Sequence, residues 1–354
     1  MQALVTIPGQ PDSARVDDLP EPDPGEDKVL IRALEVGVCG TDREIDEGQF
    51  GVAPDGEERL VLGHEFLGRV ARDGHGFAEG DLVTATVRRS CGRCAACLEG
   101  SPDACFSGDY SERGITRLHG FASELVAEHP EHVVAIPASL GRLGVLAEPT
   151  SICERGLRHV RAIGARQPWS PRRALVVGAG AIGMLSTYLL RMDGLEVWTA
   201  SRSRNEERER LIEACGARPV ATDETPLRDL AEDVGGFDVV FEAAGDAQAM
   251  LDTLGLLRRN GVACLLGIDG RPRQVSIDAH VIGVDAILQN RAIFGSVNAH
   301  TVDWRAAVEH LDRARDRWPE ALEAFVGRRV PLDAFAEAFG YRGVKATLTL
   351  EESA

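Results

Sequence analysis

The spacing of apolar and polar positions predicts a β-rich first part of the chain. Residues 28–40 (KVLIRALEVGVCG) and 80–89 (GDLVTATVRR) are rich in apolar and β-branched residues and are bounded by Gly, Pro or Asp. This pattern is typical of short strands. No sustained helical period appears before about residue 140. We therefore expect a small β-barrel in this part of the chain.

The pattern then changes to alternating strands and helices. Residues 170–204 predict a strand, a glycine turn, a helix and a second strand, and the run ALVV is apolar throughout, as in a parallel strand covered on both faces. The alternation predicts a doubly wound parallel α/β sheet. The segment 161–173, with two prolines, is the expected link into it. Later signals are a strand at 237–245, a helix leading into a strand at 249–268, a helix at 303–318 and a strand at 344–350.

Length and charge narrow the class of protein. A chain of 354 residues suggests two domains and can bury a large core without disulfides. The net charge of -17 argues against nucleic acid or anionic lipid as a partner. The N-terminal residues lack a signal-peptide pattern, and no run approaches the ~18 apolar residues of a membrane helix. We therefore expect a cytoplasmic protein with reduced thiols.

Half of the eight cysteines lie in one loop, CGRCAACLEGSPDAC, at residues 91–105. Reduced thiols at this spacing favour a tetrahedral zinc site over disulfides. Four protein ligands leave no open position on the metal, so this lobe, residues 90–106, is expected to be structural and the chemistry to lie elsewhere. The expected ligands are Cys91, Cys94, Cys97 and Cys105.

A glycine turn after the predicted strand indicates a dinucleotide site. Gly178, Gly180 and Gly183 form G-x-G-x-x-G between a strand and a helix, the context that makes the motif credible. The second predicted strand exits at Ser201 and Arg202 without the acidic residue that holds the ribose of NAD. Guanidinium groups suit a 2′-phosphate, which favours NADP over NAD, although solvated arginines would give the same pattern. The other expected cofactor contacts are Ala181, Ile182, Arg204, Gly267, Ile268, Ser296, Val297 and Asn298.

A second set of metal-binding residue types comes from three separated fragments. GVCGTD supplies Cys39 and Thr41, LGHE supplies His64 and Glu65, and LAEPTS supplies Glu148. Thiolate, imidazole and carboxylate are the mixed ligands of catalytic zinc, where an open position takes water or substrate.

These motifs, in this order along the chain, resemble the zinc-containing medium-chain dehydrogenase/reductase superfamily. SERGI (111–115), AEPTSICERG (147–156) and FGSVNAH (294–300) resemble segments of its archaeal-type glucose 1-dehydrogenases. The resemblance implies a GroES-like barrel in a catalytic domain around a Rossmann domain. It also implies two zinc ions per subunit, a sugar or polyol substrate and a homo-oligomer, a dimer or a tetramer. The expected ranges are 1–160 for the catalytic domain and 161–295 for the Rossmann domain. Residues 296–354 are expected to return to the catalytic domain.

The resemblance also suggests roles for single residues. Cys39, His64 and Glu65 look like the zinc ligands of that family, and Glu148 is similar to its mobile ligand, which can bind the metal or the sugar. Some members carry an acidic sugar contact at the position where this chain has Ile152, so the choice of sugar stays open. Arg88 or Arg89 are further candidates for hydrogen bonds to a sugar. The positions similar to the sugar contacts are Thr41, Glu112 and Asn298, with His300 nearby.

The implied reaction is oxidation of an aldose at C1 to a lactone, with hydride passing to NADP or NAD. Other zinc-dependent dehydrogenases of the superfamily, acting on polyols, amino sugars or threonine, remain alternatives. A metal-free quinone or enone reductase would have no need for Cys39 and His64. A zinc-stabilised NADPH-binding protein without activity is the non-enzymatic alternative.

Overall fold

The computed structural model describes residues 1–270 and 274–350, which form two compact units. The first contains residues 1–151, 298–315 and the segment from Val326, and the second contains Ile152–Val297 and Asp316–Phe325. Helix α3 (Ala147–Gly164) begins in the first unit and continues into the second, and α8 (Thr301–Arg317) does the same. Among the described residues no helix combines the length and the hydropathy that crossing a bilayer requires.

The first unit is built on a seven-stranded sheet in which β3 (Val29–Val38) is central. The strands follow the order β11-β6-β5-β3-β19-β18, and β10 also pairs with β3. The C-terminal strand β19 pairs with β3 in antiparallel register, placing Ala346 opposite Val38. The other strands are β5 (Glu65–Val70), β6 (Leu82–Ala85), β10 (Leu125–Glu128), β11 (Val133–Ala135), β18 (Val326–Pro331) and β19 (Lys345–Thr349).

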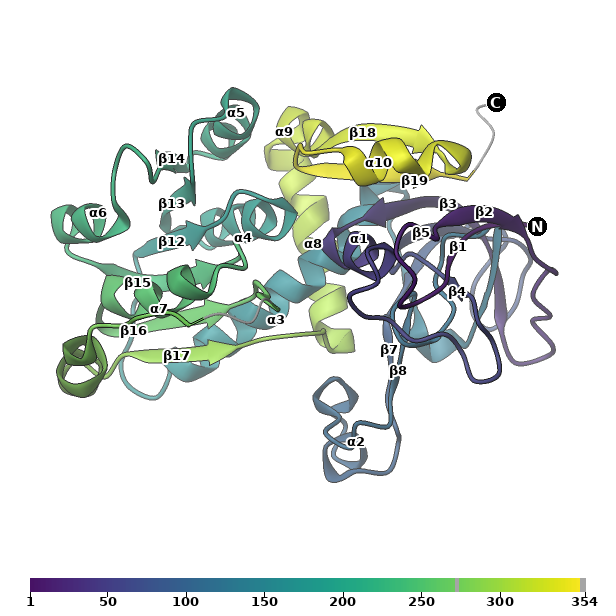
Figure 1. Ribbon diagram of the computed structural model, residues 1–354, viewed down its shortest axis with the longest axis horizontal. Coiled ribbons are helices and arrows are strands. Elements are labelled where there is room, and N and C mark those ends of the chain that lie inside the picture. The colour runs from purple at the N-terminus through teal and green to yellow at the C-terminus, as the bar shows by residue number, and fades with distance from the viewer. Residues whose placement is uncertain (271–273, 351–354) are drawn as a thin grey trace. The chain divides into compact units, whose positions relative to one another are not determined.

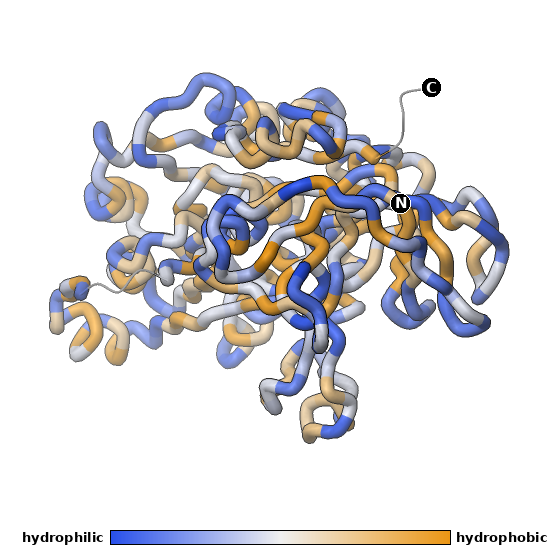
Figure 2. The backbone as a smooth tube through the Cα atoms, turned by 45° about the vertical axis from the view of Figure 1, so that its right-hand side comes forward, coloured by the Kyte–Doolittle hydropathy of each residue, from blue (hydrophilic) through white to orange (hydrophobic). Residues whose placement is uncertain are grey.

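Apolar side chains of these strands form the core of this unit. Ile31, Val36, Phe66 and Val83 are almost fully buried, and Phe66 stacks on Phe121. Figure 2 shows hydrophobic, orange stretches in the strands beside the N-terminus and hydrophilic, blue stretches at turns. The remaining elements of the core are a second sheet, β2 (Arg15–Asp18), β1 (Gln2–Thr6) and β4 (Leu60–Val61), with the helices α1 (Gly40–Asp46) and α10 (Phe335–Gly340).

The cysteine lobe extends from a separate small sheet. Strands β7 (Arg88–Arg89) and β8 (Ser111–Arg113) form an antiparallel ribbon, to which β9 (Arg117–Leu118) adds a third strand. The chain between β7 and β8 carries α2 (Ala95–Leu98) and a short 3-10 turn, Pro102–Ala104. Figure 1 shows α2 at the far end of this ribbon.

The second unit holds one parallel six-stranded sheet. Its order is β14-β13-β12-β15-β16-β17, which is the order 3-2-1-4-5-6 of dinucleotide-binding folds (Figure 1). Its buried strands are nearly continuous apolar runs because helices cover both faces. The strands are β12 (Arg173–Val177), β13 (Glu196–Ser201), β14 (Arg218–Ala221), β15 (Phe237–Glu242), β16 (Leu257–Leu265) and β17 (Ala292–Gly295). The helices are α4 (Ala181–Met192), α5 (Glu206–Ala214), α6 (Leu227–Val234), α7 (Ala247–Leu256) and α9 (Pro319–Phe325).

The predicted fold class, a barrel domain plus a doubly wound parallel sheet, is confirmed. The link expected at 161–173 differs in its first residues, which belong to α3. The reason is that RAIG continues the amphipathic period of the preceding helix until Gly164. A Cβ on Gly164 would lie 2.1 Å from the Trp169 ring, so this glycine lets the chain fold back against the helix end.

Candidate functional site

Three of the predicted metal-binding side chains meet in the first unit. One ligand atom from each of Cys39, His64 and Glu65 lies within 4.8 Å of the others, and the Cys39 Sγ is 3.2 Å from the His64 Nε2. Cys39 follows the central strand β3, Glu65 is the first residue of the neighbouring strand β5, and His64 directly precedes it. Adjacent strands thus bring together residues that are 25 positions apart in the chain.

Local backbone geometry fixes these side chains. Cys39 is the N-cap of α1, where its Sγ accepts a hydrogen bond from the Thr41 N–H at 3.2 Å and its own N–H donates to Asp42 at 2.9 Å. Gly37 lies opposite Glu65 in the strand register, and a Cβ there would lie 2.1 Å from the Glu65 Oε2. The glycine therefore makes the space that the carboxylate occupies.

Two further side chains hold this group, and sequence reasoning missed both. The Asp42 Oδ1 lies 3.5 Å from the His64 Nδ1, so it orients the imidazole with Nε2 toward Cys39. The Lys345 ammonium forms an ion pair with Glu65, and both side chains are almost fully buried. Lys345 lies on β19, about 280 residues from Glu65, so only the strand pairing reveals the contact.

The charges of this group attract one another strongly. Burial lowers the pKa of His64, but Cys39 and Asp42 raise it, and the net shift is well above its usual value. Burial likewise lowers the pKa of Lys345, which Glu65 and Cys39 raise, with a net rise. Burial raises the pKa of Asp42, yet His64 brings it below its usual value. Cys39, Asp42 and Glu65 therefore stabilise positive charge at this place, and a bound metal ion would supply it instead of the His64 proton.

The donor set fits a zinc ion. Thiolate, imidazole and carboxylate within 4.8 Å are the ligand types of catalytic zinc, and a carboxylate behind the ligating histidine is its usual second partner. Glu148 lies outside this close group, in the first turn of α3. Burial raises its pKa to about 7, while His64 lowers it and Glu65 raises it.

The residues predicted to contact a sugar are tied to the cysteine lobe. The Glu112 Oε1 accepts a hydrogen bond from the Arg88 Nε at 2.9 Å and forms an ion pair with the Arg88 Nη2 at 2.8 Å. The Asn298 side chain donates to the Asp103 carbonyl at 3.4 Å, and the His300 Nε2 lies 2.9 Å from the Gly100 carbonyl. Thr41 is elsewhere, on the first turn of α1 beside Cys39. Of the two arginine candidates, Arg89 is turned away to an ion pair with Glu128.

The four cysteines of the lobe form a closed cage. Neighbouring sulfur atoms are 3.5 to 3.9 Å apart, and within the described residues no cysteine forms a disulfide. A tetrahedron with zinc–sulfur bonds of ~2.3 Å has edges of about 3.8 Å, so the cage fits one zinc ion. A hydrogen bond from Ser107 lowers the pKa of Cys91 to about 6, whereas desolvation and its neighbours raise that of Cys97 to about 12. A bound cation would stabilise the thiolate form of all four cysteines and so remove this difference between their pKa values.

The glycine turn of the second unit has the geometry expected of a pyrophosphate site. Gly178 has a φ of 106°, a left-handed conformation that suits glycine, and a Cβ on Gly183 would lie 1.8 Å from the Gly178 carbonyl oxygen. A Cβ on Gly180, the N-cap of α4, would meet no atom within 4 Å. Open space above a helix N-terminus is where an anion is bound. Ala181 and Ile182 form the first turn of this helix.

A cavity of about 670 Å³ lies beside this turn, at the C-terminal ends of the strands. Gly178, Ser201 and Arg202 line it, together with Ala244 and Gly245. Arg204 is absent from the lining. Its guanidinium is held by Glu224, from Nε at 3.1 and 3.2 Å, and by Glu209 at 3.6 Å.

The remaining predicted cofactor contacts lie beside or beyond this cavity. Gly267 and Ile268 follow β16, and a Cβ on Gly267 would lie 2.4 Å from the Gly245 nitrogen. Ser296 and Val297 follow β17, where Val297 is exposed. Glu242, which sequence reasoning missed, fixes the cavity loop, because its Oε1 accepts from the Ala244 N–H at 2.8 Å and the Gly245 N–H at 3.1 Å.

Comparisons with known proteins agree over the full chain. Residues 141–350 match the family "Glucose dehydrogenase C-terminus", and residues 25–138 match "Alcohol dehydrogenase GroES-like domain". A glucose 1-dehydrogenase of Methanocella arvoryzae is 43% identical over 350 residues, 98% of this chain and 97% of that protein. A glucose 1-dehydrogenase of Caldivirga maquilingensis is 38% identical, covering 96% of each chain.

A solved structure also shows similarity to a glucose dehydrogenase over the full chain. The Haloferax mediterranei glucose dehydrogenase in complex with NADP, Zn and gluconolactone superposes with a TM-score of 0.92 at 32% identity, covering 100% of both chains. Fold, site and relatives define a zinc-dependent medium-chain dehydrogenase. Within that class, the chain belongs to the glucose dehydrogenase family.

Proposed function

We propose that the protein oxidises glucose, or an aldose close to it, at C1, with NADP as the hydride acceptor. The observation that carries this proposal is the family relationship over the whole chain, joined to the partly buried Cys39 sulfur and the buried His64 and Glu65 side chains, whose ligand atoms lie within 4.8 Å. The products are a lactone, NADPH and a proton. Hydride leaves C1 for the nicotinamide C4, and the C1 hydroxyl loses its proton.

Different side chains are assigned to metal binding, to proton relay and to proton acceptance. A zinc ion held by Cys39, His64 and Glu65 would supply Lewis-acid polarisation of the C1 hydroxyl. Thr41, beside Cys39 on α1, is the candidate to pass on the hydroxyl proton, because a hydroxyl donates and accepts at once. Glu148, buried in the first turn of α3, is the candidate acceptor of that proton.

Sugar recognition is assigned to Glu112, Asn298 and His300. A carboxylate, an amide and an imidazole supply the hydrogen-bond partners that a polyhydroxylated ligand requires. A site of this kind rejects analogues that lack a hydroxyl far better than an apolar pocket rejects added bulk. Simple aliphatic alcohols are therefore expected to be poor substrates.

The preference for NADP is assigned to Arg202. It lines the cavity beside Ser201, and the described residues offer its guanidinium no ion pair. Arg204 stays a predicted cofactor contact, although its guanidinium pairs with Glu224 and Glu209 and does not line the cavity. Arg202→Ala should raise the KM for NADP at least tenfold and leave that for NAD unchanged. An equal loss with both cofactors would refute the assignment.

We further propose a second, structural zinc ion in the cysteine cage and a homo-oligomer. The edge strand β17 and the adjoining segment expose Ile287, Leu288 and Ile293, and an uncovered apolar edge favours pairing with a second copy. Light scattering should report a dimer or tetramer, and a monomer at micromolar concentration would contradict this. Cysteines that form no disulfide within the described part of the chain suit the reducing cytoplasm as the compartment.

One experiment separates the candidate functions. NADP and NAD reduction is followed by absorbance over a panel of aldoses, polyols, amino sugars and threonine, with and without a chelator. Aldose oxidation that is lost with the metal supports the proposal. Turnover of a polyol or threonine without aldoses favours another zinc-dependent dehydrogenase, and NADPH binding without turnover favours the non-enzymatic alternative.

A further inference from the structure

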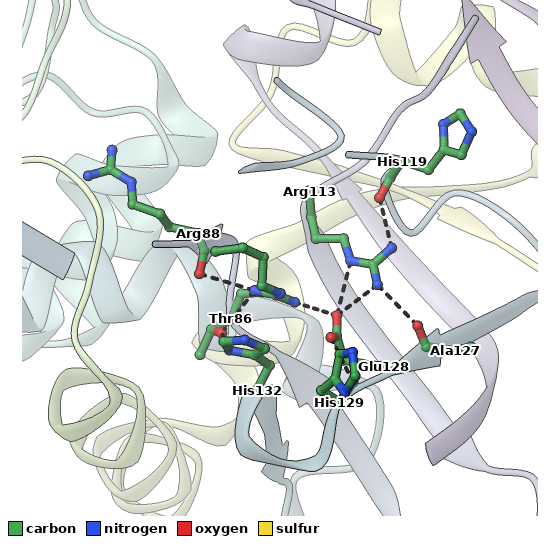
Figure 3. Close-up of polar contacts among 9 residues, drawn as sticks. Thr86, Arg88, Arg113, His119, Ala127, Glu128, His129 and His132 are labelled. Atoms are coloured by element: carbon green, nitrogen blue, oxygen red, sulfur yellow. Dashed lines mark hydrogen bonds and ion pairs between the residues drawn. The ribbon is translucent and has the colours of Figure 1, made fainter. Parts of the chain in front are cut away.

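The β7–β8 ribbon carries charged side chains on both of its faces. Its register places Arg88 opposite Glu112 and Arg89 opposite Ser111. Because successive side chains of a strand alternate between faces, Arg88 and Glu112 share one face, while Arg89 and Arg113 share the other. Figure 3 shows this division, with the Arg88 side chain directed away from Glu128 and that of Arg113 directed toward it.

One face anchors the ribbon to the barrel. Glu128, at the end of β10 and almost fully buried, forms ion pairs with Arg89 and Arg113. Arg113 donates to Glu128 from Nε at 3.0 Å, to the His119 carbonyl at 2.9 Å and to the Ala127 carbonyl at 3.1 Å (Figure 3). The backbone of the ribbon is thereby fixed, and the side chains on its other face project from a rigid base.

The other face holds Glu112 in one orientation. Arg88 donates to the Glu112 Oε1 through Nε, pairs with the same oxygen through Nη2, and donates to the Asp103 carbonyl through Nη1 at 3.2 Å. Its guanidinium carbon also lies 4.1 Å from the centre of the Tyr110 ring. The side chains of Arg88 and Glu112 are 10% and 17% exposed, so both are largely buried. Within the described residues the Glu112 Oε2 accepts no hydrogen bond, which leaves it open to a ligand hydroxyl.

The same lobe segment also orients the other two predicted sugar contacts. The Asp103 carbonyl accepts from Asn298 as well as from Arg88, and the Gly100 carbonyl faces the His300 Nε2. A short stretch of the cysteine lobe therefore connects three side chains that are separated by nearly 190 residues along the chain.

We propose that Arg88 is a positioning residue for sugar recognition. It binds one carboxylate oxygen of Glu112, presents the other to a sugar hydroxyl, and couples that orientation to the Asp103 carbonyl shared with Asn298. The inference rests on the proposed function, because it assigns Glu112 to the substrate. An Arg88–Glu112 ion pair that only stabilised the lobe would make the same contacts. The experiment therefore measures sugar binding and the stability of the protein separately.

The variants are Arg88→Met, which keeps the length of the side chain, and Arg88→Lys, which keeps the charge but not the planar fork. Arg93→Met is the matched control, because Arg93 belongs to the same lobe and its exposed side chain pairs with the exposed Asp109. Arg88→Met should raise the KM for glucose about tenfold, the size of one charge-assisted hydrogen bond, with kcat and the KM for NADP within twofold. Arg88→Lys should recover part of this loss, and Arg93→Met should behave as the parent.

A double-mutant cycle supplies the decisive comparison. In a Glu112→Gln background, which already has a raised KM for glucose, Arg88→Met should add less than twofold. Multiplicative effects of the two changes, or an Arg88→Met enzyme with the KM of the Arg93→Met control, would overturn the proposal. If Arg88→Met proved unstable in thermal unfolding, the same criteria would apply to Arg88→Lys.

Calorimetry separates a failure of the inference from a failure of the proposed function. 1,5-Anhydroglucitol lacks the C1 hydroxyl and cannot be oxidised there, so its binding to the NADP-loaded enzyme needs no turnover. Arg88→Met should weaken this binding about tenfold. A parent that oxidises glucose while the variant binds the analogue normally would refute the inference alone. A parent that neither binds the analogue nor oxidises any aldose would refute both.

Discussion

At the scale of single residues, Lys345 stands out because lysine is very rare in this chain. Lys28 and Lys345 are its only lysines, yet Lys345 is 2% exposed and pairs with Glu65. Its Nζ also donates to the Val38 carbonyl at 3.2 Å. A compact ammonium fits this enclosed position, where the longer, planar guanidinium of arginine would need more room.

Lys345→Met is therefore expected to do more than remove one contact. In the zinc-free protein it leaves the Glu65 carboxylate buried without its partner, and breaking a buried ion pair in this way costs about 3 kcal/mol. Urea unfolding of the chelator-treated protein should show that loss. Lys28→Met is the control, with an expected change within about 0.5 kcal/mol. Equal stabilities of the two variants would contradict this account of Glu65.

His132 should make stability depend on pH. Burial, followed by the positive charge of Arg89, lowers the pKa of His132 to about 4. Between pH 6.5 and 4 the unfolded chain therefore binds a proton that the native protein does not, so stability falls as the pH falls.

With allowance for partial solvent exposure, His132 should account for about 1 kcal/mol of the loss between pH 7 and pH 5. Urea unfolding at both pH values should show a drop that is smaller by this amount in His132→Asn. His75→Asn, a change at an exposed histidine, serves as control. If its pH dependence changed as much as that of His132→Asn, burial would not be the cause.

At the scale of elements, two glycines of the turn before α4 have different roles: one is required for packing and the other for ligand binding. A Cβ on Gly183 would lie 1.8 Å from the Gly178 carbonyl oxygen, whereas one on Gly180 would meet only open space. Gly183→Ala should thus destabilise the second unit by about 2 kcal/mol, in the range for overpacking.

Gly180→Ala should instead leave unfolding nearly unchanged and weaken NADP binding at least tenfold, because its methyl group enters the space assigned to the pyrophosphate. Thermal unfolding and NADPH fluorescence titration measure the two effects. If Gly180→Ala destabilised the protein and Gly183→Ala only weakened NADP binding, the turn would not bind the cofactor in this way.

The elements also show what the sequence could predict. Cys39, His64 and Glu65 were identifiable because their motifs are local, and β12 because its apolar run is continuous. Asp42, Lys345 and Glu242 were not, since their roles depend on strand register and on packing between distant segments. The end of α3 was placed too early because the link was predicted from its two prolines, whereas the amphipathic period of the helix continues to Gly164.

At the scale of the whole molecule, each compact unit carries part of the proposed chemistry. The first holds two groups of metal-binding side chains, and the second holds the glycine turn and the cavity lined by Arg202. The two metal groups differ as their proposed roles require. The cysteine cage has four ligands and is closed, whereas the group around Cys39 has three close donors and leaves a position for substrate.

The most direct test of this account measures zinc content, NADP binding and glucose oxidation together in Cys39→Ser. Serine keeps an N-cap oxygen for α1 but removes the thiolate. The account predicts that zinc falls from two ions to one per subunit, that NADP affinity is retained, and that kcat/KM for glucose falls at least about 10²-fold. Cys215→Ala, a change at a buried cysteine of the second unit, should retain both ions and full activity. Undiminished glucose oxidation by Cys39→Ser, with zinc only in the cysteine cage, would contradict the account.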